Sequence, residues 1–197
     1  MKKFYLFLSP LLFISCVSAG KVNPVDDKTP VKTEIITVEN GQLQGILNDE
    51  DDIEIFAGIP FAAPPVGALR WKEPQPAANW EGVFQADHFV PIAMQNENGA
   101  IYNWLFNLYT HSKSSRTYHV PMSEDCLYLN VWRPKAVDGQ SVTASSKLPV
   151  LVYVHGGSLM SGASWYEKYD GENLSKDGII VVTIAGEPAG SSPYSFW

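Results

Sequence analysis

The chain has 197 residues, of which 45% are hydrophobic, 18% charged and 12% aromatic, a balance typical of one globular domain. Its formal net charge is −7 and it contains no dense cluster of Lys and Arg, which excludes nucleic acid as a partner. Two cysteines are too few for a disulfide-rich scaffold or a four-thiolate zinc site, and no metal-binding motif is present, so we expect no metal and no cofactor.

Residues 1–19 have the pattern of an export signal. Lys2-Lys3 precedes an apolar run over residues 4–14, which is too short to span a bilayer comfortably. Two processing routes remain open. One is cleavage after Val17-Ser18-Ala19, and the other is acylation of Cys16, whose surroundings resemble a bacterial lipobox. We therefore expect an exported protein, secreted or periplasmic, that touches a membrane only through a lipid anchor at Cys16.

The next segments predict a tether followed by short strands. Residues 20–32 are polar and contain proline, which is typical of a flexible tether, and the folded domain is expected over residues 33–197. Apolar alternation predicts a strand over 33–38, a turn at Asn40-Gly41 and a return strand over 42–47. A third strand is expected over 53–56.

Residues 58–76 hold five prolines, so this segment is predicted to be an ordered loop rather than a helix or a central strand. Its large apolar side chains, Phe61, Leu69 and Trp71, are expected to be buried. Apolar residues at helical spacing predict a short amphipathic helix over 100–109.

The second half of the chain predicts an α/β sheet. A strand is expected over 127–132, and two continuous apolar runs, 149–154 and 179–184, are typical of central positions in a parallel sheet. A helix over 169–176 would connect them as a crossover. The run over 179–184 comes close to the end of the sequence, so we expect it to present an unpaired strand edge.

A glycine pair follows the first of these apolar runs, in His155-Gly156-Gly157-Ser158. Glycines at such a turn let the backbone approach a substrate and turn N–H groups into a pocket. Donors placed in this way stabilise a tetrahedral oxyanion. The N–H groups of Gly157 and Ser158 are therefore candidate oxyanion-hole donors, although a plain strand-to-helix turn would have the same pattern.

Residues 123–134, which include Glu124-Asp125-Cys126-Leu127-Tyr128-Leu129-Asn130, resemble the type-B carboxylesterase/lipase family of the α/β-hydrolase fold. The resemblance extends from about Thr33 to the C-terminus, and it keeps the order and spacing of the family through about Ile184. It implies an incomplete α/β-hydrolase fold, in which N-terminal hairpin strands precede the first strands of a central, mostly parallel sheet. It also implies an ion pair between Arg70 and Glu124, and a small carboxylic ester as the substrate of the family.

The segment Gly186-Glu187-Pro188-Ala189-Gly190 resembles the nucleophile elbow of that family, with proline at the position of the catalytic serine. Proline carries no nucleophile, and its fixed φ does not suit the strained elbow. The family resemblance makes the N–H of Ala189 a third oxyanion-hole candidate. Because Val182-Thr183-Ile184 runs directly into this segment, we interpret the junction as an internal deletion.

Two hypotheses follow for the function. In the first, the chain is the N-terminal part of an exported serine esterase and is inactive as it stands. It lacks the nucleophile, and its four histidines all precede the elbow-like segment, whereas the catalytic acid and histidine of the family lie far downstream of it. In the second, it is a non-catalytic exported binding or adhesion protein on an esterase-like scaffold.

Overall fold

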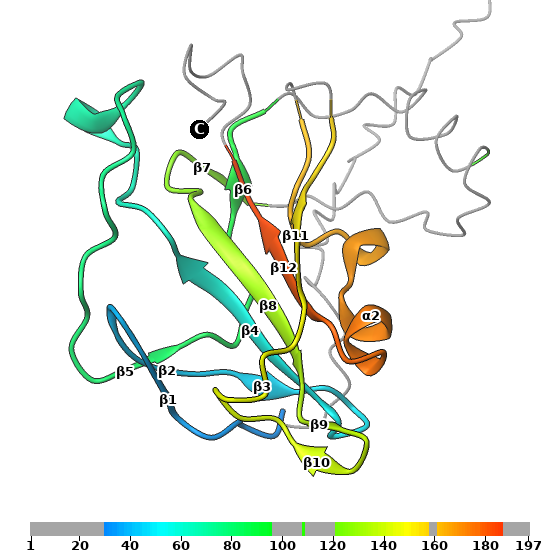
Figure 1. Cartoon of the computed structure of the whole chain (residues 1–197). Helices are drawn as coiled ribbons and strands as arrows, with labels where there is room; N and C mark the ends of the chain where they lie inside the picture. The colour runs from blue at the N-terminus through cyan, green and yellow to red at the C-terminus, as the bar shows by residue number, and fades with distance from the viewer. Residues whose placement is uncertain (1–29, 96–107, 109–120, 158–160, 187–197) are drawn as a thin grey trace, which may run out of the picture.

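The computed structural model describes residues 30–95, 108, 121–157 and 161–186 (Figure 1). A five-stranded sheet forms the centre, with the strands in the order β11-β12-β8-β4-β3. The bounds of these strands are Val150–Val154 (β11), Ile180–Ile184 (β12), Tyr128–Pro134 (β8), Ile53–Pro60 (β4) and Ile46–Leu47 (β3). The β11–β12 pair is parallel and the other three pairs are antiparallel. The described sheet therefore joins antiparallel N-terminal strands to a first parallel pair, as expected for a partial α/β-hydrolase fold.

A second sheet of three strands packs on one face of β4 and β8. Its strands are Ile36–Val38 (β1), Gly41–Gln44 (β2) and Val83–Gln85 (β5), in the order β1-β2-β5. Val38 pairs with Gly41, so the hairpin turn is Glu39-Asn40, one residue before the predicted Asn40-Gly41. Leu43, Phe56 and Ala86 form the core between the two sheets and are at most 2% exposed. Apolar alternation therefore predicts the hairpin correctly, but it places the turn one residue too late.

The remaining elements are short. They are the strands Ile92–Ala93 (β6), Met122–Ser123 (β7), Ala136–Val137 (β9) and Gln140–Ser141 (β10), the 3-10 helices Gly67–Leu69 (η1) and Glu167–Tyr169 (η2), and the α-helix Glu172–Lys176 (α2). The helix predicted over 100–109 lies outside the described residues, apart from Leu108, which is helical. None of the helices in the described ranges has the length and hydrophobicity of a membrane span.

The crossover between β11 and β12 packs against the sheet through a buried tryptophan. Trp132 on β8 is 1% exposed, and its carbonyl accepts a hydrogen bond from the hydroxyl of Ser175 on α2 at 3.1 Å. The same ring leaves no room for a side chain at Gly171, where an added Cβ would lie 2.8 Å from it. Figure 1 shows α2 beside β12. The predicted helix over 169–176 is thus divided into η2 and α2.

Of the two continuous apolar runs predicted to be central strands, only 179–184 takes a central position in the described sheet. β12 is an inner strand, since it pairs with β8 on one side and β11 on the other. β11 lies at the edge of the sheet that the described residues form, and four of its five residues are exposed. The unpaired edge therefore belongs to β11 and not to the later strand. An apolar composition shows what a strand can bury, but it does not identify the strand's neighbours.

The proline-rich segment also departs from its predicted conformation. β4 continues through Pro60 because a bulge at Ala57 and Gly58 absorbs a register shift between Phe56 and Ile59. The Ala57 and Gly58 N–H groups donate to the Ala86 carbonyl and to the Asn130 side chain, both at 2.9 Å. The predicted burial of Phe61 and Trp71 is wrong, because they are 38% and 53% exposed.

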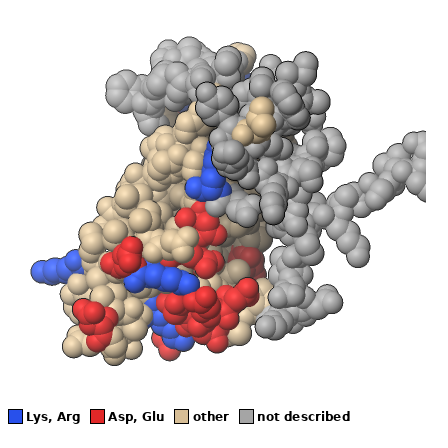
Figure 2. All heavy atoms as spheres, turned by 90° about the vertical axis from the view of Figure 1, so that its right-hand side faces the viewer, with Lys and Arg blue, Asp and Glu red and all other residues tan. Residues whose placement is uncertain are grey.

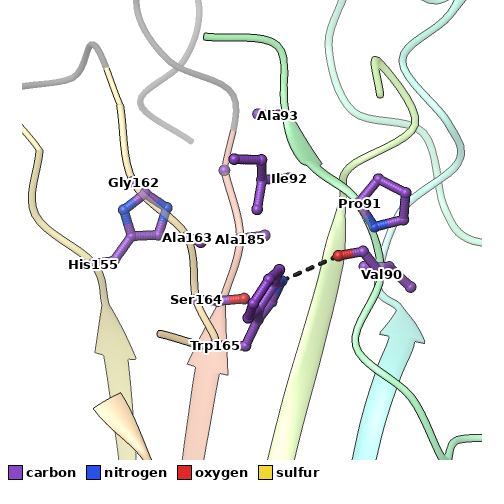
Figure 3. A pocket seen from close by; sticks show the side chains of 11 residues that line it. Val90, Pro91, Ile92, Ala93, His155, Gly162, Ala163, Ser164, Trp165 and Ala185 are labelled. Atoms are coloured by element: carbon purple, nitrogen blue, oxygen red, sulfur yellow. Dashed lines mark hydrogen bonds between the residues drawn. The ribbon is translucent and has the colours of Figure 1, made fainter. Parts of the chain in front are cut away.

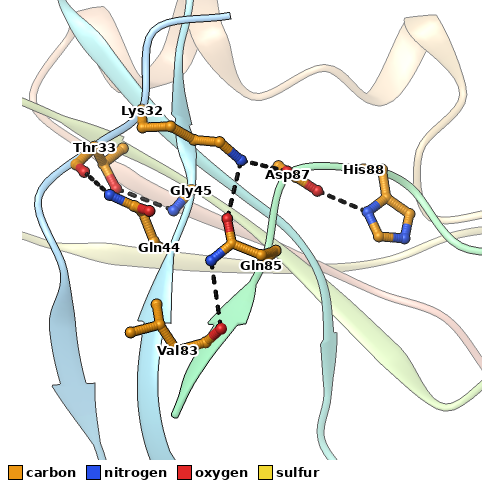
Figure 4. A network of polar contacts seen from close by, with 8 residues as sticks. All are labelled: Lys32, Thr33, Gln44, Gly45, Val83, Gln85, Asp87 and His88. Carbon is orange, nitrogen blue, oxygen red and sulfur yellow. Dashed lines mark hydrogen bonds and ion pairs between the residues drawn. The ribbon is translucent and has the colours of Figure 1, made fainter.

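The end of the predicted tether is already part of the fold. Lys32 pairs with Ile46, and the Leu47 N–H donates to the Val31 carbonyl at 2.8 Å. The Lys32 ammonium donates to the Gln85 amide oxygen at 3.1 Å and forms an ion pair with Asp87 (Figure 4). Residues 31–32 are therefore fixed to β3 and to the end of β5.

Asp87 in this network gives the fold a pH dependence. Burial alone raises the pKa of its carboxyl group, but hydrogen bonds and positive charge from Lys32 and His88 outweigh it, so the pKa lies below the ordinary 3.8. The ionised carboxylate therefore stabilises the fold above pH 3.8, and this contribution is lost as the pH falls through the folded-state pKa.

We expect Asp87→Asn to lose less stability than the unmodified chain between about pH 6 and about pH 3. Urea unfolding at each pH measures the difference. Asp138→Asn, in an exposed turn, is the matched control and should follow the unmodified chain. An identical acid-induced loss in the chain and in Asp87→Asn would contradict the role of this carboxylate.

Candidate active site

Two glycine-containing segments leave the central sheet at the same place. Val154 at the end of β11 is in register with Ile184 at the end of β12, and the strands run parallel. His155-Gly156-Gly157 and Ala185-Gly186 therefore emerge side by side at their carboxyl ends. In open α/β sheets, this end of adjacent parallel strands is where ligands bind. The two motifs that the sequence singled out thus begin at the same end of the sheet.

The loop after β11 folds back on itself so closely that two of its positions accept only glycine. Gly157 has φ +151°, and an added Cβ would lie 1.6 Å from the Ser161 carbonyl oxygen. Gly162 has φ +139°, and an added Cβ would lie 2.3 Å from Nδ1 of His155. The Ser161 N–H closes the loop by donating to the Gly157 carbonyl at 3.2 Å. These contacts, rather than the local sequence alone, explain the glycines.

A glutamine from a distant part of the sequence fixes the far end of this loop. The Gly162 N–H donates to Oε1 of Gln95 at 2.6 Å, and Nε2 of Gln95 donates to the Gly162 carbonyl at 2.8 Å. The same nitrogen also donates to the Ala93 carbonyl at 3.1 Å. The oxygen and the nitrogen of the Gln95 side-chain amide thus bind the N–H and the carbonyl of the same residue, Gly162. The sequence does not predict this role of Gln95, because nothing near position 95 indicates a partner 67 residues away.

A buried asparagine positions the opposite side of the site. Asn130 on β8 is 1% exposed; its Oδ1 accepts from the Gly58 N–H at 2.9 Å, and its Nδ2 donates to the hydroxyls of Ser164 and Thr183, each at 3.1 Å. It therefore links β4, β8, β12 and the loop before η2. The sequence reading also missed this role, although a polar residue within an apolar strand was a signal for it.

A small hollow lies between these segments (Figure 3). It is lined by Val90, Pro91, Ile92, Ala93, His155, Gly162, Ala163, Ser164, Trp165, Ala185 and Gly186. The indole N–H of Trp165 donates to the Val90 carbonyl at 3.1 Å and joins two of its walls. The hollow has a volume of about 10 Å³, which is room for about one water molecule.

The structure places only part of the predicted site. Of the three oxyanion-hole candidates, Gly157 is described, while Ser158 and Ala189 lie outside the described residues, as does Pro188. Half-buried His155 directs Nδ1 to the carbonyl of Gly156 at 3.1 Å. Within residues 30–95, 121–157 and 161–186, no three His, Cys, Asp or Glu side chains are grouped as metal ligands. Among the described residues, the predicted oxyanion hole is therefore represented by Gly157 and the loop that contains it.

Arg70 and Glu124 form an ion pair on the surface. Their side chains are 46% and 41% exposed, and Nη2 lies 2.5 Å from Oε2. The pair joins the proline-rich loop to the segment before β8. Because both charges are solvated, it contributes about 0–1 kcal/mol, rather than the roughly 3–5 kcal/mol expected for breaking a buried pair.

Tyr128 lies two residues before Asn130, on β8. Burial, reinforced by a hydrogen bond to the Asp125 carboxylate at 3.0 Å, raises the pKa of its hydroxyl to about 12. The carbonyl of Tyr128 accepts from the Ala185 N–H at 2.9 Å, so it also holds the first residue after β12. The neutral phenol thus acts as a hydrogen-bond donor that anchors the start of β8 to the segment before it.

The mixed sheet, the helical crossover and the loop at the carboxyl ends of β11 and β12 are consistent with a partial α/β-hydrolase fold. Residues 32–185 match the carboxylesterase family, and the chain belongs to that family. It is 38% identical over 161 residues to fumonisin B1 esterase of Sphingopyxis macrogoltabida, and the aligned part is 82% of this chain and 26% of that protein. It is 41% identical over 183 residues to carboxylesterase 1D of Rattus norvegicus, and the aligned part is 90% of this chain and 29% of that protein.

Solved structures give the same result for the fold. A thermophilic PNB esterase superimposes with a TM-score of 0.64 and 34% sequence identity, over 80% of this chain and 29% of that one. The carboxylesterase of Geobacillus stearothermophilus gives a TM-score of 0.60 at 30% identity, over 79% of this chain and 27% of that one. The chain thus spans less than a third of the length of these relatives.

Proposed function

We propose that this chain carries the backbone N–H donors of the oxyanion hole of a carboxylic-ester hydrolase and does not itself hydrolyse esters. The observation that carries the proposal is Pro188, which occupies the nucleophile position of the elbow-like segment 186–190. Family membership and the loop around Gly157 support the first part of the proposal. The absence of a hydroxyl at position 188 supports the second.

The substrate class follows from the relatives, which are named as esterases and carboxylesterases. In the proposed site, the N–H groups after β11 would hydrogen-bond an ester carbonyl oxygen and polarise its carbon. Hydrolysis needs an attacking group activated by a base, and an oxyanion hole alone supplies neither. None of the four histidines follows the elbow-like segment 186–190, so none takes that role.

The direct test is turnover of a p-nitrophenyl ester. We expect none above the background with the unmodified chain, because removing the nucleophile of a serine hydrolase costs roughly a million-fold in kcat. We also expect Pro188→Ser to remain inactive, because a serine hydroxyl without a hydrogen-bonded base is a poor nucleophile. Turnover by Pro188→Ser but not by Pro188→Ala would show that this chain supplies a base.

The second candidate function is a non-catalytic binding or adhesion role on the esterase-like scaffold. It is favoured by the way the loop is held, since Gln95 and Asn130 bind it through backbone and side-chain hydrogen bonds that need no nucleophile. Thermal unfolding of the chain, followed by circular dichroism, separates the two roles. A sharp, reversible transition supports a self-sufficient binding protein, and a broad, non-cooperative transition supports an incomplete hydrolase.

We propose that the protein is exported, on the basis of residues 1–19. Mass spectrometry of the N-terminus after expression in a bacterium distinguishes the two routes. A mature chain that begins at an acylated Cys16 indicates a lipoprotein, and one that begins at Gly20 indicates a secreted or periplasmic form. An intact Met1 in the purified protein would contradict export.

A further inference from the structure

The side chain of His155 binds the backbone of the loop that it begins. Its Nδ1 lies 3.1 Å from the carbonyl oxygen of Gly156. A carbonyl oxygen only accepts hydrogen bonds, so Nδ1 is the donor in this contact. The neutral ring therefore carries its proton on Nδ1 and leaves Nε2 without one.

The carbonyl of Gly156 and the N–H of Gly157 belong to the same peptide group. No cis peptide bond occurs in the described ranges, and the carbonyl and N–H of a planar trans peptide point in opposite directions. A hydrogen bond that holds the Gly156 carbonyl to the imidazole therefore also fixes the direction of the Gly157 N–H. The imidazole thus orients this N–H without contacting it.

Gly162 packs directly against the hydrogen bond between His155 and Gly156. A Cβ at Gly162 would lie 2.3 Å from Nδ1 of His155 and 2.8 Å from the carbonyl oxygen of Gly156, the two atoms that the bond joins. Figure 3 shows the imidazole ring beside Gly162. The lack of a side chain at position 162 therefore leaves the room in which the imidazole and the carbonyl meet.

Gln95 holds Gly162 in this place from outside the loop. Its side-chain amide binds the Gly162 N–H at 2.6 Å and the Gly162 carbonyl at 2.8 Å, so both backbone groups of that residue are fixed. The contacts thus run without a break from Gln95 through Gly162 to the bond between His155 and Gly156.

Hydrogen bonds, and not ion pairs, hold these residues. Among the ion pairs of the described residues, none includes Gln95, His155 or Gly162. Figure 2 shows the charged side chains of one face mainly in the lower half of the described surface, whereas the loop leaves the upper end of the sheet in Figure 1. The direction of the peptide therefore depends on hydrogen-bond geometry, which the loss of one donor can change.

We propose that His155 and Gln95 are positioning residues of the oxyanion hole, which together hold the Gly156–Gly157 peptide with its N–H directed at an ester carbonyl oxygen. This inference rests on the proposed function, in which the Gly157 N–H is one of the donors. Donors that are oriented in advance stabilise an oxyanion best, because they need not turn when the charge develops. Neither side chain has to touch the ester.

NMR of the full chain tests the proposal, because the N–H residual dipolar coupling of Gly157 reports the direction of that bond. His155→Leu and Gln95→Met each remove the hydrogen bonds of one side chain and keep its approximate size. We expect both to shift the coupling of Gly157, while the couplings of Val131 and Thr183 in the central sheet stay unchanged.

Two further variants separate positioning from a general effect on the fold. His155→Asn should keep the coupling of Gly157, because the amide nitrogen of asparagine takes the position of Nδ1. The matched control is His88→Ala, at a histidine whose side chain is 71% exposed, and it should also leave the coupling unchanged. A purely structural role would lower the stability of His155→Leu without moving the Gly157 coupling, and this result would overturn the proposal.

The ¹⁵N spectrum of the His155 ring is a readout that needs no variant. In the unmodified chain, the neutral ring should carry its proton on Nδ1, the opposite of the tautomer that free histidine favours. A proton on Nε2 would overturn the proposal. Neither readout uses an ester, so turnover of an ester by the chain would contradict the proposed function and leave these NMR results unaffected.

Discussion

Replacing Gly157 with alanine is expected to destabilise the chain by about 2 kcal/mol or more and to displace the loop after β11. The added Cβ would lie 1.6 Å from the Ser161 carbonyl oxygen, and φ at this position is +151°. A non-glycine residue held in such a conformation costs about 1–3 kcal/mol, before the clash with the Ser161 backbone is counted. Urea unfolding measures the loss, and hydrogen exchange at Ser161 and Gly162 reports the displacement.

Gly156→Ala is the matched control, because it places the same methyl group one residue earlier. A Cβ at Gly156 meets no heavy atom within 4 Å. We expect the free energy of unfolding to change by no more than about 0.5 kcal/mol. Equal effects of the two substitutions would show that the loop does not depend on the tight approach of Gly157 to Ser161.

Replacing Asn130 with leucine should be comparably destabilising, by about 3 kcal/mol. The substitution keeps the approximate size of the side chain but removes three hydrogen bonds, to the Gly58 N–H and to the hydroxyls of Ser164 and Thr183. A buried polar group left without a partner costs about 1–3 kcal/mol, and some of these groups relax towards other partners. Equilibrium unfolding in urea, followed by tryptophan fluorescence, measures the change.

The control for Asn130 is Asn79→Leu. Asn79 is exposed, and its side chain accepts one hydrogen bond from Asn40 at 3.2 Å. We expect its effect to be within about 0.5 kcal/mol. If Asn130→Leu were as mild as this control, the buried network would not hold the strands and the loop together.

Local patterns predicted most of the strands but not their neighbours. Apolar alternation located the hairpin of β1 and β2, and continuous apolar runs located β11 and β12. The same runs wrongly predicted a central position for β11, because an edge strand and an inner strand of this composition look alike in sequence. β4 was predicted to end at Phe56, because the bulge that carries it past Gly58 depends on Ala86 and Asn130, which are distant in the chain.

The candidate site was predictable where the backbone conformation determines the residue. Gly157 stood out because few residues other than glycine tolerate its geometry. Gln95 and Asn130 did not, because their roles depend on partners 67 and 72 residues away. The surface position of the Arg70–Glu124 pair was equally hidden, since a motif indicates which residues pair but not how deeply they are buried.

We propose that this chain keeps an esterase scaffold without the atom that attacks the ester. Intact-protein mass spectrometry after incubation with a fluorophosphonate probe shows whether any serine is activated. We predict an unchanged mass, because an activated serine is needed to displace fluoride from phosphorus. Stoichiometric labelling of a serine, together with turnover of a p-nitrophenyl ester that the label abolishes, would contradict it.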